Sequence, residues 1–162
     1  MYALLPLLFL FFIFGFGALE GDWSRSITGP RAAISAEAQG QMFMTYRNMV
    51  LTYLEANANT PTNSGTLPTA DLTFPLGVAA ADLPKNITNY VVVGSGTRTV
   101  YVFEPSVPGI IDAFNQEFPG DVSLGIATGG DFASDPAGVL SALPAAANIS
   151  NGDIISVVQI GE

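Results

Sequence analysis

The sequence contains no cysteine and no histidine. The first absence excludes thiol nucleophiles and disulfide bonds, and the second removes the imidazole on which many general bases and zinc sites depend. A serine nucleophile would need a lysine as its base, but Lys85, in "LPKNIT", has no serine near it in the sequence. Asp131 and Asp135 share a Gly-rich segment, yet two carboxylates are too few for calcium, which takes about six to eight oxygen ligands. We therefore predict no enzymatic activity, no catalytic or metal-binding residues and no cofactor.

Positive charge is scarce as well. Five Lys and Arg stand against 14 Asp and Glu, so the net charge is −9. Nucleic-acid binding depends on clustered cations, and this composition excludes it. Charged residues make up only 12% of the chain, while Ala, Gly, Thr, Ser and Asn are plentiful. The expected surface is polar but weakly charged, as in many envelope and extracellular proteins.

A long apolar run opens the chain, "MYALLPLLFLFFIFGFGAL", with no charged side chain before Glu20. As a helix it would be about 28 Å long, close to the roughly 30 Å hydrocarbon core of a bilayer. We predict a transmembrane anchor over residues 1–19, with Trp23 at the interface. Two alternatives stay open. Cleavage after Gly17 would make the run a secretory signal, and a processed pilin would need a short polar leader and a Glu at the fifth position of its stem.

Residues 20–33, "EGDWSRSITGPRAA", are predicted to form a linker, because Gly29-Pro30 stops a helix. Arg25 and Arg31 favour this side of the membrane as cytoplasmic under the positive-inside rule. Two acidic residues in the same linker and the acidic domain beyond it oppose that orientation. The charges therefore leave the orientation of the anchor open.

A soluble domain is predicted over residues 34–162, and it begins with a long amphipathic helix. Its apolar residues recur at spacings of three and four, which places them on one helix face: Met42, Phe43, Tyr46, Met49, Val50, Tyr53 and Leu54. Asn57, Asn59 and Pro61 are expected to end it.

The clearest strand signal is "YVVVGSGTRTVYVF" at residues 90–103, where two runs rich in Val, Tyr and Phe flank a turn. The glycines of this turn do not indicate a dinucleotide site. Thr99 stands where that fingerprint has its third glycine, and a strand follows where a helix would be needed. We interpret the segment as a β-hairpin.

Further strands are predicted at residues 121–128 and 153–160, and an edge strand or an extended run at 72–77, where Pro75 cannot donate a ladder hydrogen bond. A short helix is predicted within 107–114, a loop at "TGGDFASDPAG" and a helical turn at "PAGVLSAL". The predicted fold class is α+β. It consists of the N-terminal transmembrane helix and the long amphipathic helix packed on a small, mainly antiparallel sheet of about four strands, with a pilin-like outline.

Three residues of the long helix are candidate interaction residues. Tyr46 and Tyr53 are seven apart on one face, and Arg47 beside them is the one basic residue in the helix. The simpler interpretation makes the tyrosines core aromatics. Arg47 calls for an acidic partner on another strand or another chain, which the sequence does not identify.

The order of several segments resembles the PilM family of type IVb thin and conjugative pili, which is distinct from the actin-like protein of the same name. After the apolar run come "YRNMVLTYLEANANT", "LPTADLTFPLG", the hairpin above, "SLGIATGG" and "ISNGDIISVVQIG". The resemblance implies a small, non-enzymatic bacterial inner-membrane protein of the pilus assembly apparatus, with its domain in the periplasm and with other assembly proteins or pilins as partners. It brings no functional residues. A minor pilin and a secreted adhesive or ligand-binding domain remain alternatives, and the oligomeric state stays open.

Overall fold

The computed structural model describes residues 35–134 and 137–161. The predicted anchor over residues 1–19 and the predicted linker over residues 20–33 lie outside this range. Within the described part of the chain, no helix is long and apolar enough to cross a bilayer. The described residues belong to the predicted soluble domain.

The long helix occupies residues 35–56, and its predicted apolar face is confirmed. Five of the seven predicted side chains are buried and the other two, Met42 and Tyr53, are half-buried. The buried ones are Phe43, Tyr46, Met49, Val50 and Leu54. The helix ends before Asn57, whose side-chain amide donates to the carbonyl of Tyr53 in the last turn.

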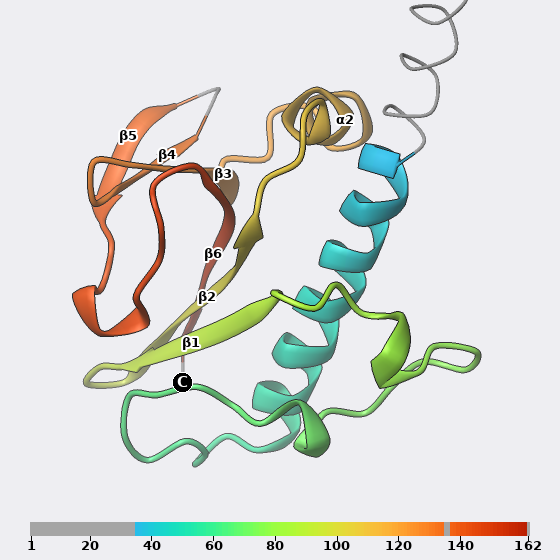
Figure 1. Cartoon of the computed structure of the whole chain (residues 1–162). Helices are drawn as coiled ribbons and strands as arrows, with labels where there is room; N and C mark the ends of the chain where they lie inside the picture. The colour runs from blue at the N-terminus through green and yellow to red at the C-terminus, as the bar shows by residue number, and fades with distance from the viewer. Residues whose placement is uncertain (1–34, 135–136, 162) are drawn as a thin grey trace, which may run out of the picture. The chain divides into compact units, whose positions relative to one another are not determined.

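Six strands form one antiparallel sheet, in the order β1-β2-β6-β3-β4-β5. The predicted hairpin is confirmed as β1 (Thr88–Val93) and β2 (Thr97–Pro105). The predicted strands near 121–128 and 153–160 are β3 (Leu124–Thr128) and β6 (Asp153–Gly161). The strand β6 lies between β2 and β3 and pairs with β2 from Thr97–Gly161 to Pro105–Asp153, the longest ladder of the sheet (Figure 1).

Two strands lie where the sequence analysis placed other structure, so the prediction of about four strands is wrong. The strand β4 (Asp131–Ser134) lies in the predicted loop, and β5 (Gly138–Ala142) lies in the predicted helical turn. Both segments are short and rich in Gly, Ala and Ser, which have little strand preference of their own. The strand β4 pairs with β3 on one side and with β5 on the other. This pairing, rather than local composition, holds both segments in the extended conformation.

The close approach of β3 and β4 depends on Gly125. A Cβ atom at this position would overlap the backbone carbonyl of Ala133 and the ring of Phe132. Only glycine therefore lets the two strands meet at this distance.

The helix predicted within 107–114 is confirmed as α2 (Ile110–Glu117), which starts after Gly109 in the left-handed conformation. The segment 57–87 between the long helix and β1 contains no strand, so the edge-strand alternative at residues 72–77 is wrong. These residues run from an extended Leu72 into a turn, which is closed by a hydrogen bond from the backbone N–H of Val78 to the carbonyl of Pro75. Part of this segment covers the edge of β1, because Gly65 and Val91 exchange backbone hydrogen bonds of 2.9 and 2.8 Å.

Both faces of the sheet are covered, which explains the nearly continuous burial along β2. Val100 and Val102 face the long helix and α2 in the larger core cluster, together with Ile154 of β6. The alternate residues Tyr101 and Phe103 face the opposite side. There they meet Phe132 of β4 and, from the segment that leads back to β6, partly buried residues such as Ile149. The sheet curls around this second cluster (Figure 1).

Candidate functional site

The first candidate, Tyr46, lies inside the core and is 1% exposed. Its hydroxyl oxygen accepts a 2.7 Å hydrogen bond from the side-chain amide of Asn89 in β1. That amide also donates to the carbonyl of Leu67 at 3.1 Å and accepts from the backbone N–H of Leu67 at 2.8 Å. A buried polar group costs free energy unless it is hydrogen-bonded. Here the Tyr46 hydroxyl oxygen and both the NH₂ group and the oxygen of the Asn89 amide have hydrogen-bond partners. The group joins the long helix, β1 and the segment that covers β1.

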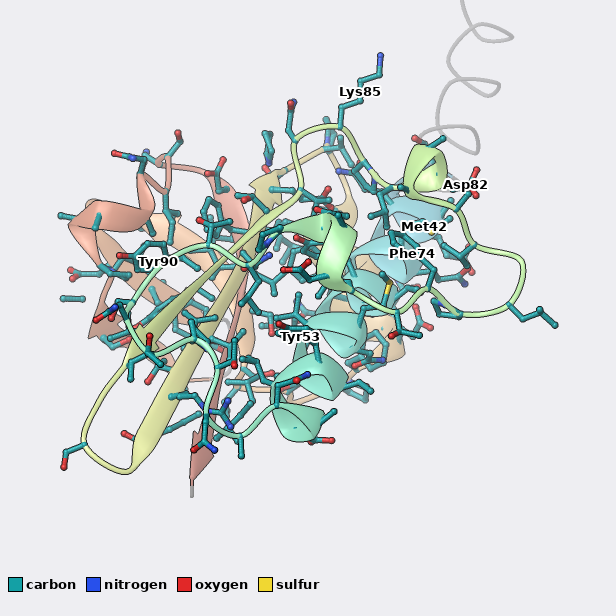
Figure 2. The ribbon with its side chains drawn as sticks, turned by 90° about the horizontal axis from the view of Figure 1, so that it is seen from below. Met42, Tyr53, Phe74, Asp82, Lys85 and Tyr90 are labelled. Atoms are coloured by element: carbon teal, nitrogen blue, oxygen red, sulfur yellow. The ribbon has the colours of Figure 1, made fainter. Side chains whose placement is uncertain are left out.

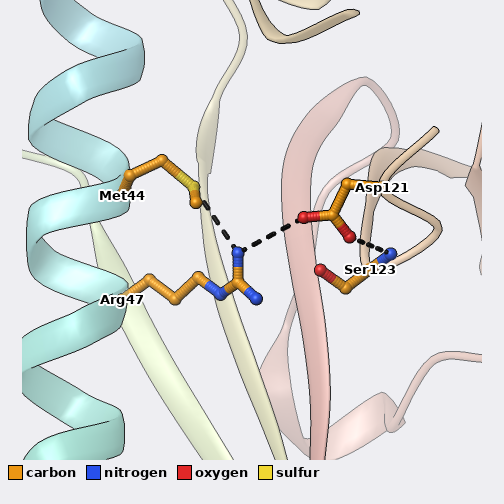
Figure 3. A network of polar contacts seen from close by, with 4 residues as sticks. All are labelled: Met44, Arg47, Asp121 and Ser123. Atoms are coloured by element: carbon orange, nitrogen blue, oxygen red, sulfur yellow. Dashed lines mark hydrogen bonds and ion pairs between the residues drawn. The ribbon is translucent and has the colours of Figure 1, made fainter. Parts of the chain in front are cut away.

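Arg47 points toward the loop between α2 and β3 (Figure 3). Its Nη1 lies 3.7 Å from Oδ2 of Asp121 and 3.6 Å from the sulfur of Met44. The other carboxylate oxygen of Asp121 accepts the backbone N–H of Ser123 at 2.8 Å, which fixes the loop. The acidic partner of Arg47 in this structure is thus a residue of the same chain.

Tyr53 is half-buried at the margin of the larger core cluster (Figure 2). Tyr46, Arg47 and Tyr53 therefore do not meet in one exposed patch. Tyr46 packs inside the fold, Arg47 reaches a neighbouring loop, and Tyr53 is the one tyrosine of the pair with part of its ring accessible.

Sequence reasoning missed two buried charged residues of β2. The first, Arg98, is 5% exposed, and its Nη1 donates to the carbonyls of Asn57 and Thr60 at 3.2 and 2.9 Å. These carbonyls follow directly on the end of the long helix, where the helix dipole favours a positive charge. Arg98 thus holds the chain as it leaves the helix.

The second, Glu104, is 1% exposed, and neither of its carboxyl oxygens has a hydrogen-bond partner of good geometry. Burial raises the pKa of Glu104 to about 7, and a weaker interaction with the side chain of Gln39 lowers it slightly. Burial dominates because an ionised carboxylate without partners is poorly solvated in an apolar core. Glu104 therefore binds a proton far more readily than an exposed glutamate.

The sequence did carry a signal for both residues. Arg98, Val100, Val102 and Glu104 follow one another at every second position along β2, and such residues of a strand point to the same face. The period of two thus places both charges on the core side of the hairpin. Their neighbours across the fold depend on the packing of the long helix, which the period does not specify.

Hollows open on the surface of the described domain, and the linings of two of them bear on function. The first has a volume of about 270 Å³ and lies between α2 and the β3–β4 pair, lined by Ile111, Phe114, Leu124 and Ile126, with Asn115 and Ser134 among its polar residues. The second, the helix groove, has a volume of about 370 Å³. Thr45, Asn48, Met49 and Thr52 of the long helix form one wall, and Thr73, Phe74 and Pro75 form the other. Among the residues that the structure describes, neither lining contains an ionisable group, so these surfaces suit binding by shape and apolar contact.

Next to the helix groove, residues 73–81 form a projecting loop with the uncharged sequence "TFPLGVAAA". Leu76 at its tip is fully exposed. The loop leaves the body of the domain beside the long helix (Figure 1), while Phe74 at its base packs against that helix (Figure 2).

Comparisons with known proteins agree with this fold. The sequence model of the PilM family matches residues 9–157. A crystal structure of a PilM protein from Escherichia coli B7A is similar, with a TM-score of 0.56 and 21% sequence identity, over 77% of this chain and 92% of that one. At this identity the likeness shows the fold alone. No curated protein sequence matches the chain.

Proposed function

The chain belongs to the PilM family, and from this premise we propose that it is a non-enzymatic inner-membrane component of a type IVb pilus assembly apparatus. It acts as a bitopic scaffold, anchored by residues 1–19, with its α+β domain in the periplasm. Its partners are other pilus-assembly proteins or pilins. The observation that carries the proposal is the family match over residues 9–157, which includes part of the apolar run as well as nearly all of the domain.

The chemistry of the domain supports a binding role. Two of its buried polar side chains, Asn89 and Arg98, fasten segments of the fold to one another through backbone carbonyls. The described residues that line the two surface hollows are uncharged. A protein that assembles with others through shape and apolar contact needs such surfaces and no reactive group.

The first test is the location and mass of the mature chain in its native host. Membrane fractionation followed by intact-protein mass spectrometry should find the full-length chain in the inner membrane. Protease added to spheroplasts should degrade the domain if it lies in the periplasm. Deletion of the gene should abolish pili while pilin synthesis continues. Normal pili in the deletion strain would contradict the assembly role.

A minor pilin is the second candidate, because a long helix packed on an antiparallel sheet is also the outline of a pilin. This is an analogy of fold and carries less weight than the family match. Presence of the chain in sheared filaments would favour it. A chain shortened near Gly17 and found in the soluble fraction would instead favour a secreted adhesive or ligand-binding domain.

A further inference from the structure

The first turns of the long helix, residues 35–40, are held to the domain by small contacts, and we call them the helix start. Ala36 is buried there, but its side chain is a single methyl group. The side-chain amide of Gln39 donates to the carbonyl of Pro105 at 3.5 Å, which is long for a hydrogen bond. Gly40 has no side chain and weakens a helix relative to alanine. The large core side chains of this helix begin only with Phe43, so the helix start can loosen at little cost.

Glu104 faces the long helix from β2, and its carboxyl group lies at the helix start. The side chain of Gln39 interacts with this carboxyl group and also reaches the carbonyl of the next residue, Pro105. Glu104 is 1% exposed, and neither carboxyl oxygen has a hydrogen-bond partner of good geometry. A neutral carboxyl group tolerates such a site far better than a carboxylate, which needs hydrogen bonds, a counter-charge or water.

No opposite charge offsets ionisation of Glu104 in the part of the chain that the structure describes. Arg47 of the long helix pairs with Asp121, and Arg98, toward the other end of β2, donates to backbone carbonyls. The carboxylate of Asp153 in β6 accepts a backbone N–H, and β1 has no charged residue. The other charged residues of the long helix, of α2 and of the segment before β1 are exposed: Glu37, Glu55, Asp112, Glu117, Asp71, Asp82 and Lys85.

We propose that the helix start is a proton-controlled flap: the protonated carboxyl group of Glu104 keeps it packed on the sheet, and loss of that proton to water raises the population of an opened form. In the opened form, water reaches the carboxylate. The helix start is the part that moves, because the other neighbours of Glu104 are paired strands such as β6 and large core side chains. The proposal concerns the described domain and does not depend on the pilus role.

The direction of the pH effect follows from linkage. Glu104 has a pKa of about 7 in the closed form, against an ordinary value of 4.5 for a hydrated carboxyl group. The closed form therefore binds the proton more tightly, and opening increases as the pH rises from about 4.5 to about 7 and then levels off. Between about pH 5.5 and about pH 8.5, these two pKa values give a rise of roughly 30-fold in the opening equilibrium constant.

Hydrogen exchange of the full-length chain in detergent measures this opening, with each rate divided by the intrinsic rate at the same pH. The backbone N–H groups of residues 39–43 donate to the carbonyls of residues 35–39 in a helix, so their protection reports on the helix start. This protection should fall by about 10- to 30-fold between the two pH values in the wild type and stay constant in Glu104→Gln. The amides of residues 48–54 should keep their protection. Glu117→Gln, at an exposed carboxylate of α2, is the matched control and should behave as the wild type.

The absence of cysteine from the sequence allows an independent test by thiol labelling. Ala36→Cys places a thiol on the buried side of the helix start, and Ser35→Cys places one at the adjacent exposed position. Dividing the maleimide labelling rate of the first by that of the second corrects for the pH dependence of thiol ionisation. This ratio should rise with pH when Glu104 is present and stay low when Glu104→Gln is added.

Three results would overturn the proposal. Protection of residues 39–43 that does not change with pH in the wild type would do so. An equal loss of protection in Glu104→Gln would assign the pH effect to another group. A loss of equal size throughout the domain would show that ionisation of Glu104 promotes global unfolding without a local opening.

Discussion

Replacing Glu104 by glutamine should stabilise the domain at alkaline pH and leave its stability nearly unchanged at acid pH. Glu104 lies in β2 opposite Ile154 of β6, is 1% exposed and has no hydrogen-bond partner of good geometry. Glutamine has a similar shape and stays neutral at every pH. The variant therefore removes the cost of a buried negative charge and keeps the packing.

The magnitude follows from linkage between proton binding and folding. The pKa of Glu104 is about 7 in the folded chain against an ordinary value of 4.5. These values differ by about 2.5, and each whole pKa step corresponds to about 1.4 kcal/mol, so the protonated carboxyl favours folding by roughly 3–4 kcal/mol. This contribution is fully present below about pH 4.5 and is lost as the pH rises through about 7. Above that range the wild type lacks it and the glutamine variant is the more stable of the two.

Chemical denaturation followed by far-ultraviolet circular dichroism, at about pH 5 and about pH 8, measures this difference. The gap between variant and wild type should widen by roughly 2–3 kcal/mol between the two conditions. Glu117→Gln is the matched control, because Glu117 is exposed on α2 and its replacement should change little at either pH. Parallel stability curves for Glu104→Gln and the wild type would refute an unpaired buried carboxyl at this position.

Three further changes test the packing, each by thermal melting and chemical denaturation of the variant. Tyr46→Phe leaves the side-chain amide of Asn89 one acceptor short and should cost about 1–2 kcal/mol; an unchanged midpoint would show that the buried bond adds nothing. Gly125→Ala places a methyl group against the β4 backbone and should cost several kcal/mol, on the order of a severe core substitution, or prevent folding. Val50→Asp puts an unpaired charge in the core and should destabilise by on the order of 4 kcal/mol or more, whereas Glu55→Gln on the exposed face should change stability by less than about 0.5 kcal/mol. Equal small effects of these last two changes would contradict the assigned helix face.

Local pattern was sufficient for the elements that carry strong periodic signals. The long helix shows apolar residues at spacings of three and four, and Phe43, Val50 and Leu54 from that pattern are fully buried. The β1–β2 hairpin combines β-branched and aromatic residues with a glycine turn, and its register follows the turn. In both cases the preference of the segment agrees with the fold.

Local pattern failed where pairing partners distant in sequence determine the structure. The segment of β5, "GVLSA", has no strong strand preference of its own, and in the described part of the chain it pairs with β4 alone. The candidate interaction residues show the same limit. The spacing of Tyr46, Arg47 and Tyr53 places them on the helix, but Asn89 and Asp121, which bind the first two, come from other parts of the chain. The alternating pattern could have identified Arg98 and Glu104 as facing the core. It could not have shown that Arg98 donates hydrogen bonds to backbone carbonyls while the carboxyl oxygens of Glu104 lack hydrogen-bond partners.

The position of β6 in the sheet has a consequence for synthesis of the protein. Every other strand leaves the ribosome before β6, yet β6 joins the β1–β2 hairpin to the β3–β4–β5 meander. Until residues 153–161 emerge, these two halves have no direct strand pairing, and β2 and β3 each present an unpaired edge. Until β6 pairs with them, such edges can associate with other chains. A chain cut short before residue 153 is therefore expected to expose both edges and to aggregate more readily than the complete domain.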